Sequence, residues 1–322
     1  MKKDTEDSSH DYKGNPSADI RELVIPDSEG GQRLDQALSR LLPEFSRNRI
    51  QNWIRARKIA VDEAFPSTKM KLCGGENVRV EIETDPSATP DSPEAIPLEV
   101  VHEDPMLMVI NKPVGLVVHP GSGNRQGTLL NALLHWVPQV AELPRAGIVH
   151  RLDKDTSGLL VVAKTLRSHT DLVRQLQSRT VKREYLALVY GEMDRSGTVN
   201  APLARDPHNR VKRTVHTMGK EAITHYDVVE RFPGITLVRC KLETGRTHQI
   251  RVHMQHIGHP LVGEDTYNAS RRSHHKLPFP RQALHAERLG LIHPVTQELV
   301  QWECPLPSDF AGILGALRAN AL

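Results

Sequence analysis

A proline-rich, acidic stretch divides this chain into two parts. Residues 84–97 contain four prolines and no Lys or Arg. Proline has no backbone N–H and ends helices and inner strands, so such a stretch stays extended and solvated. We therefore predict a linker at residues 84–97 between two domains, residues 30–83 and residues 98–322. Residues 1–29 are polar and are predicted to be a disordered acidic tail.

The charges are distributed unevenly along the chain. It carries 42 Lys and Arg against 39 Asp and Glu, a net charge of +3. The tail and residues 83–99 are acidic, at −4 and −5, whereas residues 30–82 and 100–322 are basic, at +4 and +8. Basic domains favour a polyanionic partner such as RNA. Aromatic residues make up only 4% of the chain, which disfavours a protein that binds single strands by stacking bases.

The sequence also indicates in which cellular compartment the protein resides. The longest apolar run, residues 159–163, is far shorter than the roughly 20 residues that a membrane-spanning helix needs. The first thirty residues hold no apolar segment typical of a secretory signal. Three scattered cysteines favour a reducing compartment: Cys73, Cys240 and Cys304. We expect a cytoplasmic protein that acts as a monomer and does not bind a membrane.

The smaller domain is predicted to contain two helices and a few short strands. Apolar residues recur at helical spacing over residues 34–42, and Pro43 ends that helix. Ser46 is placed to cap a second helix, whose apolar face contains Trp53. Short β-type runs lie at residues 23–25, 59–61 and 78–82. Cations on the opposite face and around it are expected to bind RNA: Arg33, Arg47, Arg49, Arg55, Arg57 and Lys58.

The larger domain is richer in strands than in helices. Short β-type runs lie at residues 106–111, 159–163, 185–190, 224–229 and 235–243. Helical patterns lie at residues 129–135, 168–177 and 247–256. Because the two kinds of element do not alternate regularly, we predict an α+β fold with a mixed, mainly antiparallel sheet flanked by helices and loops.

The densest group of polar side chains lies in one loop between two apolar strands. The loop contains His150, Arg151, Asp153, Lys154, Asp155, Thr156, Ser157 and Gly158. Rigid strands on either side would hold such groups in place for catalysis. Equally, Asp, Thr and Ser side chains can simply satisfy the backbone of a turn. Asp153 and Asp155 are both candidate catalytic acids on chemistry alone.

Two further segments supply candidate partners for that loop. Arg251 lies in a cation-rich helical pattern and is able to pair with a buried Asp. Tyr185 begins an apolar strand, where most tyrosines simply pack. A hydrogen-bonded helix is favoured over a metal site, because no zinc spacing fits the four nearby histidines: His248, His253, His256 and His259. No phosphate loop or nucleophile elbow is present, so we expect neither a nucleotide cofactor nor serine hydrolysis.

Together these segments resemble the RluA family of RNA pseudouridine synthases. The run from His150 to Gly158 matches the signature motif of that family. Tyr185 and Arg251 match two further motifs in the same order. Other matching segments are residues 111–113 and 285–286, so the resemblance covers roughly residues 98–318.

Other segments of the chain resemble particular branches of that family. The smaller domain is similar to the S4 RNA-binding domain that the RluC and RluD branches carry. Residues 119–124, 130–135 and 144–149 resemble the RluD branch. One departure stands out: the usual Val-Asn-Gly of the S4 turn is replaced by Val61-Asp62-Glu63, so we expect an altered hairpin there.

The resemblance implies an isomerase that cleaves the N1–C1′ bond of uridine, rotates the uracil and rejoins it through C5. Asp153 would be the catalytic carboxylate, which either attacks C1′ or removes the 2′ proton, and Arg251 would keep it ionised. Tyr185 would pack against the base near the departing C5 proton. Arg151 would enter the RNA helix in place of the flipped uridine. No metal or other cofactor is implied.

The resemblance also implies a substrate. The RluD branch implies large-subunit (23S) ribosomal RNA, at the uridine-rich loop of helix 69, and the RluC branch offers other sites in the same RNA. Two other functions are alternatives to this interpretation. A non-catalytic RNA-binding or ribosome-assembly factor would have no use for a buried Asp153, Tyr185 and Arg251. A hydrolase that pairs Asp153 with Asp155 would lack a water-activating metal site.

Overall fold

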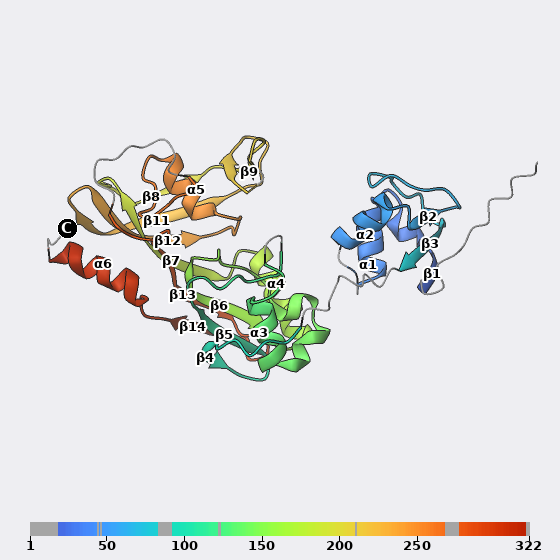
Figure 1. The fold of residues 1–322 in the computed structure, drawn as a ribbon, viewed down its shortest axis with the longest axis horizontal. Helices are drawn as coiled ribbons and strands as arrows, with labels where there is room; N and C mark the ends of the chain where they lie inside the picture. The colour runs from blue at the N-terminus through green and yellow to red at the C-terminus, as the bar shows by residue number, and fades with distance from the viewer. Residues whose placement is uncertain are drawn as a thin grey trace, which may run out of the picture. The chain divides into compact units, whose positions relative to one another are not determined.

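The computed structural model describes residues 19–43, 45, 47–82, 92–121, 124–209, 211–267 and 277–319. The chain divides into two compact units between residues 90 and 91, inside the stretch predicted as a linker. The first unit is drawn in blue in Figure 1, and the second runs from green to red. Each unit has its own apolar core.

The first unit packs two helices against a small sheet. Its strands are β1 (Asp19–Val24), β2 (Ile59–Val61) and β3 (Asn77–Ile82), all antiparallel in the order β1-β3-β2. The helices are η1 (Asp27–Glu29), α1 (Leu34–Leu41) and α2 (Arg47–Arg55). Both predicted long helices are therefore present, and Ser46, the expected cap of α2, lies outside the described residues.

The predicted disordered tail is wrong for residues 19–29. β1 pairs with β3 along its whole length, and Ile25 just after it is buried in the core. The edge strand expected at residues 23–25 is thus present but begins earlier, at Asp19. The sequence did not reveal this because the residues before the strand are polar and its partner β3 lies more than fifty residues further along the chain.

The turn that lacks glycine still forms a tight hairpin. Val61 and Ala64 exchange two backbone hydrogen bonds of 2.8 and 2.9 Å around Asp62 and Glu63. Both intervening residues have left-handed backbone angles, with φ of 46° and 65°. A two-residue hairpin of this kind usually has glycine at its second position, because positive φ costs other residues about 1–2 kcal/mol. The expected alteration is therefore backbone strain rather than a different turn.

The second unit is built on a nine-stranded sheet. Its order is β4-β5-β6-β13-β7-β12-β11-β8, with β14 paired to β13. The strands are β4 (Glu99–Glu103), β5 (Leu107–Lys112), β6 (Ser157–Ala163), β7 (Lys182–Tyr190), β8 (Gly197–Asn200), β11 (Ile223–Phe232), β12 (Ile235–Leu242), β13 (Leu284–Ile292) and β14 (Leu299–Glu303). Only the β6–β13 pair is parallel. The mixed, mainly antiparallel α+β fold is confirmed.

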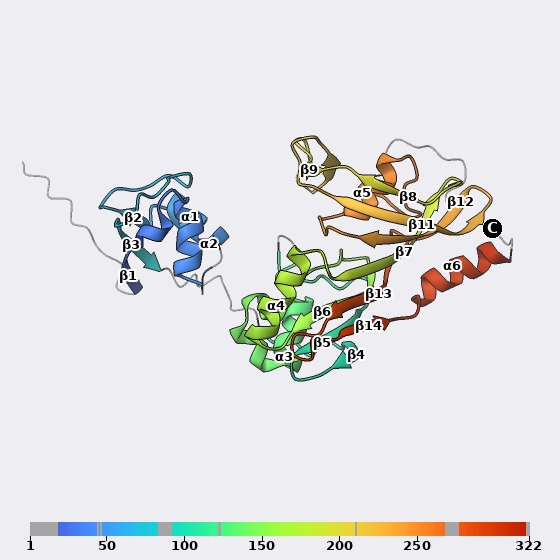
Figure 2. The ribbon, with the colours of Figure 1, turned by 180° about the vertical axis from the view of Figure 1, so that it is seen from behind.

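Helices cover both faces of this sheet. Ile250 and Met254 of α5 (Gln249–His256) pack in the same core as Tyr185 and Ala187 of β7. Phe310 of α6 (Ser308–Arg318) packs on the other face; Figures 1 and 2 show the two helices apart from each other across the sheet. The remaining elements are α3 (Leu129–Trp136), η2 (Pro138–Glu142), η3 (Pro144–Gly147), α4 (Leu166–Gln177) and the short ladder of β9 (Leu203–Arg205) and β10 (Arg213–Val215).

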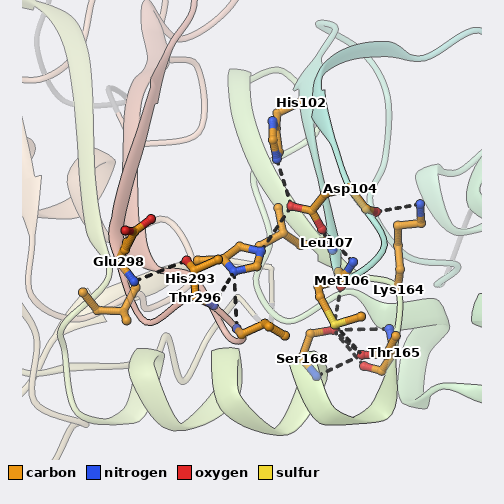
Figure 3. Close-up of polar contacts among 12 residues, drawn as sticks. His102, Asp104, Met106, Leu107, Lys164, Thr165, Ser168, His293, Thr296 and Glu298 are labelled. Atoms are coloured by element: carbon orange, nitrogen blue, oxygen red, sulfur yellow. Dashed lines mark hydrogen bonds and ion pairs between the residues drawn. The ribbon is translucent and has the colours of Figure 1, made fainter.

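A half-buried carboxylate links β4, β5 and the end of β13 (Figure 3). Asp104, in the turn between β4 and β5, accepts the backbone N–H groups of Met106 and Leu107 at 2.6 and 2.9 Å. Its other oxygen contacts the Nε2 atoms of His102 at 2.9 Å and of His293, just after β13, at 3.2 Å. Burial opposes ionisation, but these contacts outweigh it and lower the pKa of Asp104.

The parallel pair brings the polar loop against the centre of the sheet. Ser157 and Gly158 lie opposite His285 and Ala286 of β13. Gly158 has φ of +110°, and a Cβ there would lie 2.2 Å from the carbonyl oxygen of Ala286. Only glycine fits this crossing, so the end of the loop is fixed in place.

Glu63→Gly is expected to stabilise the first unit by about 1 kcal/mol, since glycine adopts positive φ without the Cβ clash. Slower hydrogen–deuterium exchange over residues 59–82 of the full chain would report the gain. Glu63→Ala keeps the Cβ and serves as the matched control. Equal protection in the two variants would contradict the assignment of strain to this residue.

Candidate active site

The polar loop and α5 meet at one ion pair. Asp153 lies in the loop before β6, and its Oδ2 accepts a hydrogen bond of 3.1 Å from Nη1 of Arg251 on α5. The side chains are 16% and 8% exposed, so the pair is largely shielded but Asp153 remains accessible. The contact joins residues 98 positions apart in the chain. The pairing of Arg251 with a loop carboxylate, expected from the sequence, is therefore present.

A second carboxylate, which the sequence did not reveal, holds the arginine in place. Glu264 is fully buried and accepts two hydrogen bonds from Arg251, at 2.6 Å from Nε and 2.8 Å from Nη2. Thr266 accepts a third, at 3.1 Å, and the ring of Tyr267 lies 5.3 Å from the guanidinium carbon. Burial alone would lower the pKa of Arg251, but Glu264 and Asp153 reverse this and raise it. Arg251 is therefore a fixed cation with Nη1 directed at Asp153.

His248 lies on the other side of the Asp153 carboxylate. It precedes α5 with a left-handed φ of 57°. Its Nδ1 contacts the hydroxyl of Tyr267 at 2.6 Å, and its Nε2 lies 3.7 Å from Oδ1 of Asp153. Burial lowers the pKa of His248, although the charge of Asp153 opposes the shift. The imidazole is thus neutral at neutral pH.

Tyr185 lies on the sheet beneath these groups. It is 6% exposed and is flanked across the ladder by two small residues, Cys240 of β12 and Ala286 of β13. Burial raises the pKa of the Tyr185 hydroxyl, Arg183 opposes that shift, and Asp153 adds to it. Tyr185 is therefore the bulky residue at this point of the sheet, between two small neighbours.

Buried cations hold the loop by its backbone. Nζ of Lys112, which is completely buried, donates to the carbonyl groups of Pro113, Leu116 and Lys154 at 2.7, 2.9 and 3.0 Å. Burial lowers the pKa of Lys112 to about 8, despite the nearby loop carboxylates. Arg281 donates to the carbonyl of Asp155 at 3.0 Å. Of the two candidate acids, Asp153 is the one in hydrogen-bond contact with Arg251.

The other residues that the sequence analysis singled out do not contact Asp153 in the same way as Arg251. Arg151 is exposed, and together with Arg145 and burial it lowers the pKa of His119 to about 4. His253 contacts Thr224 and the carbonyl of Ala201, both at 2.9 Å. Within the described parts of the chain, no group of three or more His, Cys, Asp or Glu side chains could hold a metal ion.

In the first unit, the predicted RNA-binding cations have several kinds of neighbour. Arg33 and Arg47 contact the fully buried carboxylate of Asp35 at 3.0 and 2.8 Å, so both stabilise the fold of the unit. Arg49 lies over the rings of Phe45 and Trp53, and Arg57 lies over the ring of Phe65. Arg55 donates to the side chain of Asn52. Lys58 follows α2 and is half-buried.

Comparisons with known proteins agree with this geometry. The sequence model of the RNA pseudouridylate synthase family matches residues 106–256. The chain is 53% identical over 304 residues to "Ribosomal large subunit pseudouridine synthase D" of Nitrosomonas europaea, covering 92% of this chain and 88% of that protein. A protein of the same name from Pasteurella multocida is 51% identical over 303 residues, covering 91% and 93% of the two chains.

A solved structure is also similar to this chain. "Human RNA Pseudouridylate Synthase Domain Containing 4" superposes with a TM-score of 0.55 at 27% identity, covering 68% of this chain and 93% of that one. No helix among the described residues is long and apolar enough to cross a membrane. The three sequence motifs, the fold and these relatives together establish that the chain is an isomerase and belongs to the RluA family of RNA pseudouridine synthases.

Proposed function

We propose that this enzyme converts uridine to pseudouridine in the 23S RNA of the large ribosomal subunit, at the loop of helix 69, and that it works in the cytoplasm as a monomer. Relatives that match about nine-tenths of the chain carry the name of a large-subunit enzyme. The RluD-like stretches at residues 119–124, 130–135 and 144–149 support the choice of site. The contact of Asp153 with Arg251 is the observation that carries the chemistry.

Asp153 is the catalytic carboxylate in this proposal. It either attacks C1′ or removes the 2′ proton, and both roles need it ionised. A fixed guanidinium 3.1 Å away favours the charged form of a carboxylate. Glu264 occupies the other side of that guanidinium, so Arg251 does not shift toward Asp153 and block it. Tyr185 supports the uracil after the glycosidic bond breaks and lies where the C5 proton departs.

Arg151 is the residue that replaces the flipped base. It is exposed two residues before Asp153, on the same loop. Extruding a uridine from a paired or stacked RNA costs a few kcal/mol, and a side chain that fills the gap recovers part of that cost.

The first unit is an S4 RNA-binding domain in this proposal and supplies affinity without reading bases. Of its cations, Arg55 and Arg57 are exposed near the end of α2. Contacts of this kind with phosphates make binding depend on salt. Arg33, Arg47, Arg49 and Lys58 complete the expected RNA-facing set.

Asp153→Asn is expected to abolish pseudouridine formation while RNA binding survives, because only the carboxylate charge is lost. In a strain that lacks the gene, the wild type should restore pseudouridines in the helix 69 loop and the variant should not, as read by chemical derivatisation and primer extension of 23S RNA. Asp155→Asn is the matched control. An active Asp153→Asn enzyme alongside an inactive Asp155→Asn enzyme would overturn the assignment.

Arg151→Ala is expected to slow turnover on a folded ribosomal RNA fragment by about tenfold or more, because the cost of base flipping is no longer recovered. Turnover on a short unstructured RNA should change much less. Arg167→Ala, an exposed arginine on α4, serves as control. Equal losses on the two substrates would argue against a flipping role.

Arg55→Gln/Arg57→Gln in the full chain is expected to weaken RNA binding and to reduce the slope of log affinity against log salt by about 2, roughly one for each lost phosphate contact. Filter binding over a series of salt concentrations measures the slope. Arg40→Gln/Arg79→Gln removes two cations that already have Glu29 and Glu81 as partners. The same slope change in both variants would mean that only net charge matters.

A further inference from the structure

One buried cation of the second unit has no carboxylate partner. Arg183 lies near the start of β7 and is 7% exposed. Its Nη2 donates to the carbonyl of Glu243 at 3.2 Å. Its Nε has no hydrogen-bond partner, and it is the only buried side-chain nitrogen or oxygen of which this holds among the described residues. No carboxylate of the described residues lies within ion-pair distance of Arg183.

This arrangement differs from that of the other buried arginines. Arg251 is held by Glu264 and Arg281 by Asp309. Arg239, which is half-buried, is held by Glu287. Removing a guanidinium from water without a compensating charge costs several kcal/mol, and burial accordingly lowers the pKa of Arg183. A residue that weakens the fold to this extent is typical of a site where negative charge develops during a reaction.

The neighbours of Arg183 identify where that charge develops. Tyr185 is two residues along the same strand, so both side chains project from the same face of the sheet. The hydroxyl of Tyr185 is close enough for the charge of Arg183 to act against the effect of burial on its pKa. His150 lies on the same side and is held neutral, with a pKa lowered to about 3 by burial and by Arg183.

A glycine makes room for the guanidinium. A Cβ at Gly245, in the segment between β12 and α5, would lie 2.5 Å from Nη1 of Arg183. Any larger residue there would push the guanidinium away from its present place. The segment that leads to Arg251 therefore also shapes the space around Arg183.

We propose that Arg183 is a positioning residue for Tyr185: its buried charge stabilises the tyrosine oxygen while that oxygen takes the proton from C5 of the rotated uracil. In this step the C5–H electron pair restores the C5–C6 double bond, and the electrons of the N1–C6 double bond move to N1. The tyrosine proton passes to N1 and the C5 proton passes to the tyrosine oxygen. Tyr185 ends as a neutral phenol, and the inference rests on the proposed uridine isomerisation.

The test compares substrate RNA that carries hydrogen or deuterium at uridine C5. Arg183→Met is expected to lower kcat by at least about tenfold, a part of the roughly 10²–10⁴-fold that proton-transfer catalysis contributes, with little change in KM. The ratio of the rates with hydrogen and deuterium should rise above that of the wild type, because removal of the C5 proton becomes slower than the other steps. Arg183→Lys should recover part of the rate.

Two further variants separate this role from a purely structural one. Gly245→Ala keeps the charge but displaces it, so the isotope ratio should rise here as well. Arg239→Met makes the same change on the opposite face of the sheet and should leave the ratio unaltered. Arg183→Met should also retain or raise the midpoint of thermal unfolding, since it removes an unpaired buried charge.

Other results of these experiments would overturn the proposal. A fall in kcat with an unchanged isotope ratio would place Arg183 at an earlier step and overturn the proposal, as would an unchanged kcat. If the wild type leaves the helix 69 fragment unmodified, the proposed substrate is wrong, and the same ratio is then measured on the RNA that the wild type does modify. Failure of the substrate and failure of the Arg183 role are therefore distinguishable.

Discussion

The geometry of the site depends on one arginine shared by two carboxylates of unequal burial. Glu264 is fully buried and binds Arg251 through two hydrogen bonds, so it fixes the plane of the guanidinium. Asp153 takes the one remaining nitrogen and stays partly accessible. If Asp153 made as many hydrogen bonds to Arg251 as Glu264 does, both of its oxygens would be occupied by the arginine. Because Glu264 takes most of the donors, Asp153 has a nearby positive charge and an Oδ1 that makes no hydrogen bond to the arginine.

The loop that carries Asp153 is held by its backbone rather than by its acidic side chains. Lys112 and Arg281 donate to the carbonyl groups of Lys154 and Asp155, the two residues of one turn. Gly158 then fixes the point where the loop joins the sheet. Cations used in this way position the loop and leave its side chains available.

Local pattern was sufficient to predict much of this fold. Continuous apolar runs predicted the inner strands at residues 159–163 and 235–243, and helical spacing predicted α3, close to its observed bounds. The central strand β13 was missed because Glu287 and Arg288 interrupt its apolar pattern. β1 was missed over most of its length, since an edge strand needs few apolar residues.

The site was predictable only in part. The motifs identified Asp153, Tyr185 and Arg251, but Glu264 is an acid thirteen residues after Arg251 with no pattern around it. Spacing on a helix face suggested that Arg47 is directed at RNA, but it gave no sign that Arg33 and Arg47 both contact Asp35. Pairings of this kind depend on the three-dimensional approach of elements, which one-dimensional spacing does not contain.

The place of β13 in the sheet has a consequence for synthesis of the chain. This strand lies between β6 and β7, and so it alone joins the strands β4, β5 and β6 to the other half of the sheet. The segment with Asp153 and the strand with Tyr185 belong to different halves. A ribosome that makes this protein must release residues 284–292 before the halves can unite. The sheet that carries the site therefore cannot assemble on the nascent chain before this strand has emerged.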